Sequence, residues 1–171
     1  MVANKCAPLG IVALMGCAVA EEAADSAWTQ GIDEDIAYET VRVLAQTSSD
    51  SIADEYGNKQ VNPVVQFRCT EGGDGSVSMQ IAWQRFVSSF NTEAGFQVDD
   101  GKRNWIKLGV DDSNTVTRSR SDSDVTTLIG SLSTGTSLSV EIEPYSEPAV
   151  QVSFDLRGFA AGIATLRDAC T

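Results

Sequence analysis

The chain contains no histidine, and this absence removes several kinds of catalytic and metal site at once. Without imidazole there is no Ser-His-Asp or Cys-His catalysis, no histidine general base and no metal site built on histidine ligands. Basic residues are also scarce, because 12 Lys and Arg stand against 24 Asp and Glu, a formal net charge of −12. Cations are needed to displace counterions from phosphates, so we expect no nucleic-acid partner, and an anionic membrane surface should repel the chain.

Long hydrophobic runs are missing as well, and the apolar segment at the N-terminus is too short to span a bilayer. Residues 9–20 form 12 uncharged positions, whereas a membrane-spanning helix needs about 20. Lys5 precedes this segment, and the small-residue sequence Ala-Val-Ala ends it just before Glu21. These features are typical of a secretory signal peptide, so we expect residues 1–20 to be cleaved after Ala20 and the protein to be periplasmic or otherwise exported, without a membrane span.

A second interpretation of the same segment is a lipoprotein signal. The sequence Leu14-Met15-Gly16-Cys17 resembles a lipoprotein box, in which Cys17 would be lipidated and become the new N-terminus. Methionine before the glycine is a poor match to that box. We therefore favour cleavage after Ala20, with a lipid anchor at Cys17 as the alternative.

Cleavage after residue 20 would leave residues 21–171 with 11 basic against 24 acidic residues, a charge of −13, and two cysteines, Cys69 and Cys170. We expect these residues to form a single β-rich domain. An even pair of cysteines in an exported chain predicts a disulfide, and two separate buried thiols are the alternative. A bridge would close a loop of about 100 residues, which chain-entropy arguments value at roughly 4–5 kcal/mol.

Apolar residues alternate with polar ones along most of the chain, which is the pattern of half-buried strands. We expect strands over residues 38–47, 64–70, 76–83, 96–98, 105–110, 138–142 and 150–154. Short turn-like connections and the lack of a strand–helix–strand rhythm predict antiparallel pairing. The fold class is therefore mainly β (β-rich α+β), an antiparallel sandwich-like or curved sheet with a mid-chain helix and a C-terminal helix packed on it.

The two helices follow from apolar residues at helical spacing. Residues 125–132 place Val, Leu, Ile and Leu on one helical face, and Asp122 or Ser123 is expected to cap its N-terminus. A terminal helix would bury one face starting at Phe159, and Asp155 is expected to help cap it.

The N-terminal part of the expected domain is harder to place. Residues 21–36 are acidic and weakly patterned, with Trp28 and Ile32 as the large apolar anchors. We expect this segment to settle onto the domain rather than form a core element. The tryptophans, Trp28, Trp83 and Trp105, are interpreted as core and core-edge anchors rather than as a binding face.

Paired acidic residues are the main candidates for chemistry in this chain. The pairs are Asp99-Asp100, Asp111-Asp112 and Asp122/Asp124. A glycosidase needs two carboxylates that face each other, whereas aspartates in turns usually accept local hydrogen bonds, so we interpret these pairs as turn chemistry on an acidic surface. Calcium binding is the alternative, although the EF-hand spacing is missing. No Ser-x-x-Lys element and no phosphate-binding loop occurs, so we expect no catalytic residue, no cofactor, no metal and no enzymatic activity.

The order of several segments resembles a known family. Val-Val-Gln-Phe-Arg-Cys at 64–69 precedes Met-Gln-Ile-Ala-Trp at 79–83, and Leu-Ser-Val-Glu-Ile-Glu-Pro-Tyr follows at 138–145. The chain ends with Phe-Asp-Leu-Arg-Gly at 154–158 and Leu-Arg-Asp-Ala-Cys at 166–170. This order is similar to the VasI/TagO-like family of small exported proteins associated with type VI secretion clusters. The resemblance extends over about residues 60–171, and the last 20 residues are its most specific part.

The resemblance implies that the two cysteines form a disulfide and that the protein is a non-enzymatic accessory component of the bacterial cell envelope. Such a protein would bind another envelope or secretion-system component. A second hypothesis is a periplasmic inhibitor or immunity-like module that the acidic charge steers toward a basic hydrolase. A third is a glycan hydrolase that uses carboxylates such as Asp99 or Asp111. The sequence names neither the partner nor the binding face.

Overall fold

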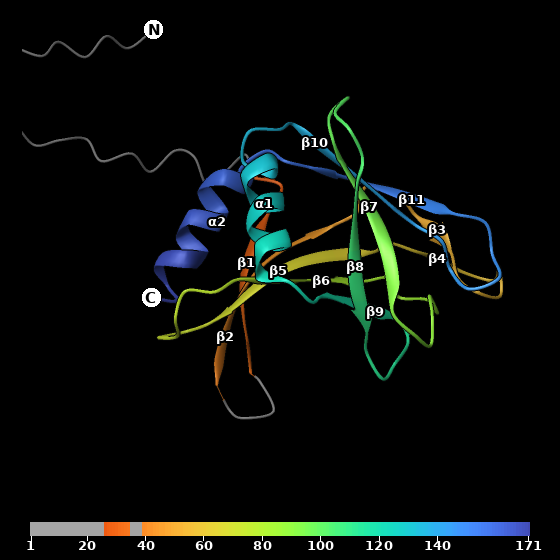
Figure 1. The fold of residues 1–171 in the computed structure, drawn as a ribbon, viewed down its shortest axis with the longest axis horizontal. Coiled ribbons are helices and arrows are strands. Elements are labelled where there is room, and N and C mark those ends of the chain that lie inside the picture. Colours follow the sequence, from red (N-terminus) through yellow and green to blue (C-terminus); the bar gives the residue numbers. More distant parts are fainter. Residues whose placement is uncertain (1–25, 35–38) are drawn as a thin grey trace, which may run out of the picture.

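This computed structural model describes residues 26–34 and 39–171 of the chain. Within them it contains eleven strands and two helices (Figure 1). The predicted signal peptide and Cys17 lie outside the described residues. The strands are β1 (Thr29–Glu34), β2 (Thr40–Thr47), β3 (Ile52–Ala53), β4 (Gln60–Val61), β5 (Val64–Thr70), β6 (Ser78–Ala82), β7 (Thr92–Val98), β8 (Asn104–Val110), β9 (Val116–Ser119), β10 (Ser137–Ile142) and β11 (Val150–Asp155). The helices are α1 (Asp122–Leu132) and α2 (Phe159–Asp168).

Nine of the strands form one antiparallel sheet in the order β1-β2-β5-β6-β9-β8-β7-β10-β11, and β3 and β4 form a separate hairpin. The sheet curls so that its two ends approach each other without closing a barrel. The backbone N–H of Ser49, just after β2, donates to the carbonyl of Ser153 on β11 at 3.2 Å, and the indole N–H of Trp28 donates to the carbonyl of Asp155 at 2.8 Å. The prediction of a mainly β fold with a curved antiparallel sheet is confirmed.

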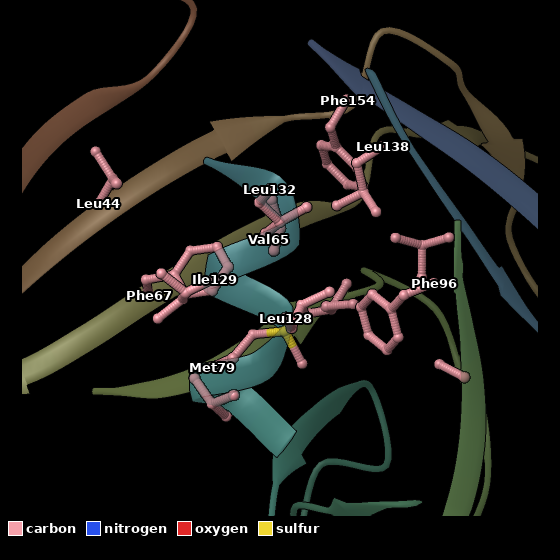
Figure 2. Packing of buried hydrophobic residues seen from close by; sticks show 14 of the residues in the cluster. Leu44, Val65, Phe67, Met79, Phe96, Leu128, Ile129, Leu132, Leu138 and Phe154 are labelled. Carbon is pink, nitrogen blue, oxygen red and sulfur yellow. The ribbon is translucent and has the colours of Figure 1, made fainter. Parts of the chain in front are cut away.

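Helix α1 lies in the hollow of the curved sheet, where it contacts β6 and β9 (Figure 1). It buries Val125, Leu128, Ile129 and Leu132, the face that the sequence predicts. Figure 2 shows Leu128, Ile129 and Leu132 pointing into an interior shared with residues of β5, β6, β7 and β10. This interior is the hydrophobic core of the described residues.

The capping residue of α1 differs from the prediction. Ser121, rather than Asp122 or Ser123, is the N-cap, and its hydroxyl accepts from the backbone N–H of Asp124 at 3.3 Å. An N-cap residue needs an extended backbone. Ser121 has this conformation, with φ −138° and ψ 120°, whereas Asp122 already begins the helix.

Helix α2 packs against β2 and β5. The contact is close, because a Cβ atom at Gly162 would lie 2.8 Å from Cδ1 of Leu44. The prediction that Asp155 caps this helix is wrong. Gly158 is the N-cap and makes no side-chain cap bond, and its φ of 79° suits glycine. The carboxylate of Asp155 instead accepts from the backbone N–H of Arg157 at 2.8 Å.

The segment before β2 also departs from expectation, because β1 is a regular strand paired with β2 along its length. Trp28 is buried, as predicted for an anchor. Ile32 is 64% exposed, so the prediction that it is an apolar anchor is wrong. The short strand β9 was likewise not predicted. It joins β6 to β8, and its buried residue is the polar Thr117 rather than an apolar one.

Candidate functional site

The predicted disulfide between Cys69 and Cys170 is present. Cys69 lies on β5 and Cys170 just after α2, their Cα atoms are 6.0 Å apart, and both residues are buried. The bridge therefore ties the chain terminus to a central strand. Reaction with an outside thiol requires access to the sulfur atoms, so this buried bond serves the structure rather than exchange chemistry.

Asp99 of the first acidic pair binds the start of β10. Its carboxylate accepts from the hydroxyl of Thr136 at 2.6 Å, from the backbone N–H of Thr136 at 3.1 Å and from that of Ser137 at 2.9 Å. The Thr136 hydroxyl, followed by these two N–H groups, holds the pKa of Asp99 below its usual value. The carboxylate stays ionised and joins the β7–β8 turn to β10, and its neighbour Asp100 is exposed.

The other acidic pairs lie in a turn and at the start of a helix. Asp111 accepts from the Ser113 hydroxyl at 2.7 Å and from the Val116 N–H at 3.2 Å. Partial burial raises the pKa of Asp111, but these donors outweigh it and the net pKa is lowered. Asp122 and Asp124 occupy the first turn of α1. Within residues 26–34 and 39–171, no group of three or more acidic or cysteine side chains is arranged to hold a metal ion.

A more distinctive surface lies where three loops meet at the end of the molecule opposite α2 (Figure 1). The loops comprise residues 54–59 between β3 and β4, residues 83–91 between β6 and β7, and residues 143–149 between β10 and β11. We refer to this surface as the loop face. The backbone N–H of Tyr145 donates to the carbonyl of Val87 at 2.8 Å and so links two of the loops directly.

Arg85 holds the loop face together from inside. It is only 3% exposed, and its guanidinium donates to the carbonyl of Ala53 at 2.7 Å and to the carboxylate of Glu147 at 2.5 Å. Next to it, the backbone N–H of Phe86 donates to the carboxylate of Glu55 at 3.2 Å. A buried charge is stable only when it is paired and hydrogen-bonded, and Arg85 meets this need by joining all three loops.

Two residues of the loop face have left-handed backbone conformations. Gln84 has φ 58° and Ser146 has φ 60°, a conformation that costs a non-glycine residue roughly 1–2 kcal/mol. Such conformations persist when the surrounding contacts enforce them. The loops beside Arg85 are therefore held in defined conformations.

Three large aromatic side chains project from the loop face. Tyr56 is 76% exposed, Phe90 77% and Tyr145 70%, so each loop contributes one ring to the surface. Large apolar groups are usually buried, and a group of exposed ones marks an interaction surface. Together with the buried guanidinium beneath them, these rings form the best-defined candidate site among the described residues.

The loop face carries more acidic than basic side chains. Glu55 and Glu143 are exposed on it, and Lys59 is its exposed cation. Asp54 shapes the β3–β4 turn by accepting from the backbone N–H of Asn58 at 2.8 Å. Desolvation raises the pKa of Asp54, but backbone donors led by Asn58 outweigh it and lower the pKa overall. The surface is thus aromatic with an anionic rim.

Sequence reasoning missed this site. Its aromatic residues, Tyr56, Phe90 and Tyr145, lie in turn-like segments outside the alternating strands. Large aromatic residues in such segments were the available signal in the sequence. What the sequence does not contain is the convergence of the three loops, because it depends on how the sheet curls.

The fold and its bridge define a disulfide-linked, mainly β protein. No family model matches the chain, and no curated protein matches it. Among solved structures, the chain is similar to the crystal structure of invasion associated protein B from Bartonella henselae, with 18% sequence identity and a TM-score of 0.49. The match covers 82% of this chain and 90% of that one. Similarity at this level supports no conclusion about function.

Proposed function

We propose that the chain is an exported, non-enzymatic accessory protein of the bacterial cell envelope that acts by binding another protein through the loop face. The observation that carries this proposal is the set of three exposed aromatic side chains on loops that buried Arg85 holds in place. Tyrosine and other aromatic residues are enriched at protein interfaces and at their energetic hot spots.

Preorganisation supports a binding role. A surface whose loops are already ordered loses less conformational freedom when a partner binds. Arg85 provides that order through contacts to Ala53 and Glu147, which lie on the other two loops or next to them. The loop face should therefore bind with little rearrangement.

The remaining features support the proposal of an exported accessory protein. The buried disulfide is typical of an oxidising compartment. The absence of histidine and the local hydrogen bonds of Asp99 and Asp111 favour a role other than catalysis. The resemblance to the VasI/TagO-like family favours a type VI secretion component as the partner.

A second candidate function is inhibition of a basic periplasmic hydrolase, in the manner of an inhibitor or immunity protein. The anionic rim of the loop face and the net charge of −12 favour it. Complementary charge accelerates association at low salt, so this partner would bind faster as ionic strength falls.

The test compares two variants of the full chain in pull-downs from the native envelope under non-denaturing conditions. The triple variant Tyr56→Ser/Phe90→Ser/Tyr145→Ser should lose the partner, whereas the control Ile32→Ser, also an exposed apolar position, should keep it. The recovered protein is then purified and rebound at increasing salt, which separates an envelope component from a basic hydrolase. Equal recovery by both variants would contradict the proposal.

A further inference from the structure

A groove runs between α1 and the strands β7 and β8, away from the loop face. Its volume is about 440 Å³, which is within the range of small-molecule sites, roughly 300–1,000 Å³. The apolar part of its lining includes Phe96, Val98, Ile106 and Leu128. Its polar lining includes Lys102, Asn104, Asp124, Thr127 and Ser131. An apolar floor with a few polar groups is the usual composition of a ligand site.

Lys102 lies at the end of the groove beside the C-terminus of α1. The β7–β8 turn that carries it is joined to the segment after α1, because the carboxylate of Asp99 accepts from the backbone N–H of Thr136 at 3.1 Å. Ser131, in the last turn of α1, lines the same end. Lys102 is exposed and forms no ion pair within the part of the chain that the structure describes.

Asp124 lies at the opposite end of the groove. Strand β9 pairs with the far end of β8, with Ser119 opposite Leu108, and α1 starts directly after β9. Asp124, in the first turn of α1, is therefore distant from the β7–β8 turn. It is exposed, and its carboxylate forms no ion pair with any other described residue.

The length of the groove along α1 suits a short peptide. From Asp124 to Ser131 the helix advances by seven residues, or about 10 Å at about 1.5 Å per residue. An extended peptide spans about 3.3–3.6 Å per residue, so about three residues match this length. A free ammonium group would complement Asp124, and a free carboxylate would complement Lys102.

We propose that this groove binds a zwitterionic peptide of about three residues with an apolar middle side chain. The ammonium group lies at Asp124, the carboxylate at Lys102, and the middle side chain against Val98, Ile106 and Leu128. The site is separate from the loop face, so either proposal can fail without the other.

The direct test is calorimetric titration of the full chain with the tripeptide Ala-Leu-Ala and with its N-acetylated and C-amidated forms. Exposed charge pairs contribute roughly 0.2–1 kcal/mol, so each blocked end should weaken binding by a factor of about 1.4 to 5. N-acetylation of the peptide should not weaken its binding to the Asp124→Asn variant any further. C-amidation of the peptide should likewise not weaken its binding to the Lys102→Gln variant any further. These double-mutant cycles, each combining one protein substitution with one blocked peptide end, assign each end of the peptide to one residue.

The location of the bound peptide is tested on α1 itself. Ser131→Phe should abolish binding by filling the groove, whereas Thr126→Phe, an exposed position on the same helix outside the groove, should leave it unchanged. If Ser131→Phe does not fold, the charge variants decide the question.

Three results would overturn the inference. The first is binding of a doubly blocked peptide as tightly as the free one. The second is tighter binding of a simple fatty acid such as decanoate, which would make the groove a lipid site. The third is no saturable binding up to about 10 mM, which corresponds to less than about 3 kcal/mol of affinity.

Discussion

At the α2 end of the molecule the rings of Trp28, Phe67 and Phe159 pack against one another with centroids 4.9 to 6.0 Å apart, and all three side chains are buried. At the loop face the aromatic side chains point outward and are at least 70% exposed. The same residue class therefore stabilises the fold at one end and remains available for contact at the other. This difference separates the residues that stabilise the protein from those that we expect to bind.

The two ends also differ in what holds them in order. The Cys69–Cys170 bond and apolar packing hold α2 on the sheet. Polar contacts of one buried side chain, Arg85, hold the loops. Substitutions at the α2 end should thus affect global stability, and substitutions at the loop face should mainly affect binding.

Removal of the disulfide is expected to have the largest effect. The bridge joins residues 101 positions apart, and closing a loop of this length stabilises by roughly 4–5 kcal/mol in the chain-entropy model. Cys69→Ala/Cys170→Ala should therefore lower the free energy of unfolding by about 4 kcal/mol, measured by urea denaturation. Hydrogen exchange should accelerate first in α2. A loss below about 1 kcal/mol would show that packing alone holds the helix.

Loss of the buried guanidinium should have the next largest effect. Arg85→Met keeps the apolar volume but removes the contacts to Ala53 and Glu147. Hydrogen bonds to charged groups contribute about 1.5–3 kcal/mol, so we expect a loss of about 2–3 kcal/mol. Hydrogen exchange should rise in the three loops and stay unchanged in α2.

Arg120→Met is the matched control for this variant. Arg120 is exposed, and a surface substitution usually changes stability by less than about 0.5 kcal/mol. If both variants lose the same stability, or if exchange rises equally at both ends in Arg85→Met, then Arg85 does not order the loop face specifically.

The α2 end was largely predictable from the sequence, because its signals are local or compositional. Two cysteines remained after the expected signal peptide, and Phe159, Ile163 and Leu166 follow helical spacing and are buried as predicted. Periodicity reports on which side chains face the core. It does not report on β1, whose pairing with β2 rests on backbone hydrogen bonds and whose one large apolar residue, Ile32, is exposed.

The loop face was not predictable for a related reason. Arg85 lies in a loop sequence where arginine is normally exposed, and it is buried only because three distant segments converge on it. Trp105, which the sequence analysis interprets as a core or core-edge anchor, is 50% exposed, and this exposure had a local signal. Ile106 and Leu108 on β8 are buried, so at most one of Trp105 and Ile106, as adjacent residues in a strand, faces the core.

The smallest expected effect is a pH-dependent one at Asp155, which precedes α2. The backbone N–H of Arg157 holds the pKa of Asp155 below its ordinary value of 3.8, and burial opposes this shift while the Arg157 guanidinium adds to it. Because the folded pKa is lowered, the stabilisation is fully present above pH 3.8. It is lost as the pH falls through the folded pKa.

Asp155→Asn tests this linkage, because asparagine keeps an oxygen acceptor for the Arg157 N–H but removes the charge and the second oxygen, which accepts from Nε of Arg157 at 2.7 Å. The pair is solvent-exposed, so wild type should be more stable than the variant by only a few tenths of a kcal/mol near neutral pH. That difference should shrink as the pH falls below 3.8. Asp54→Asn, the equivalent change at the loop face, should show the same sign of pH dependence, with its exchange effect confined to the β3–β4 turn. A stability difference that grows on acidification would show that the carboxylate of Asp155 is not stabilised by its contacts with Arg157.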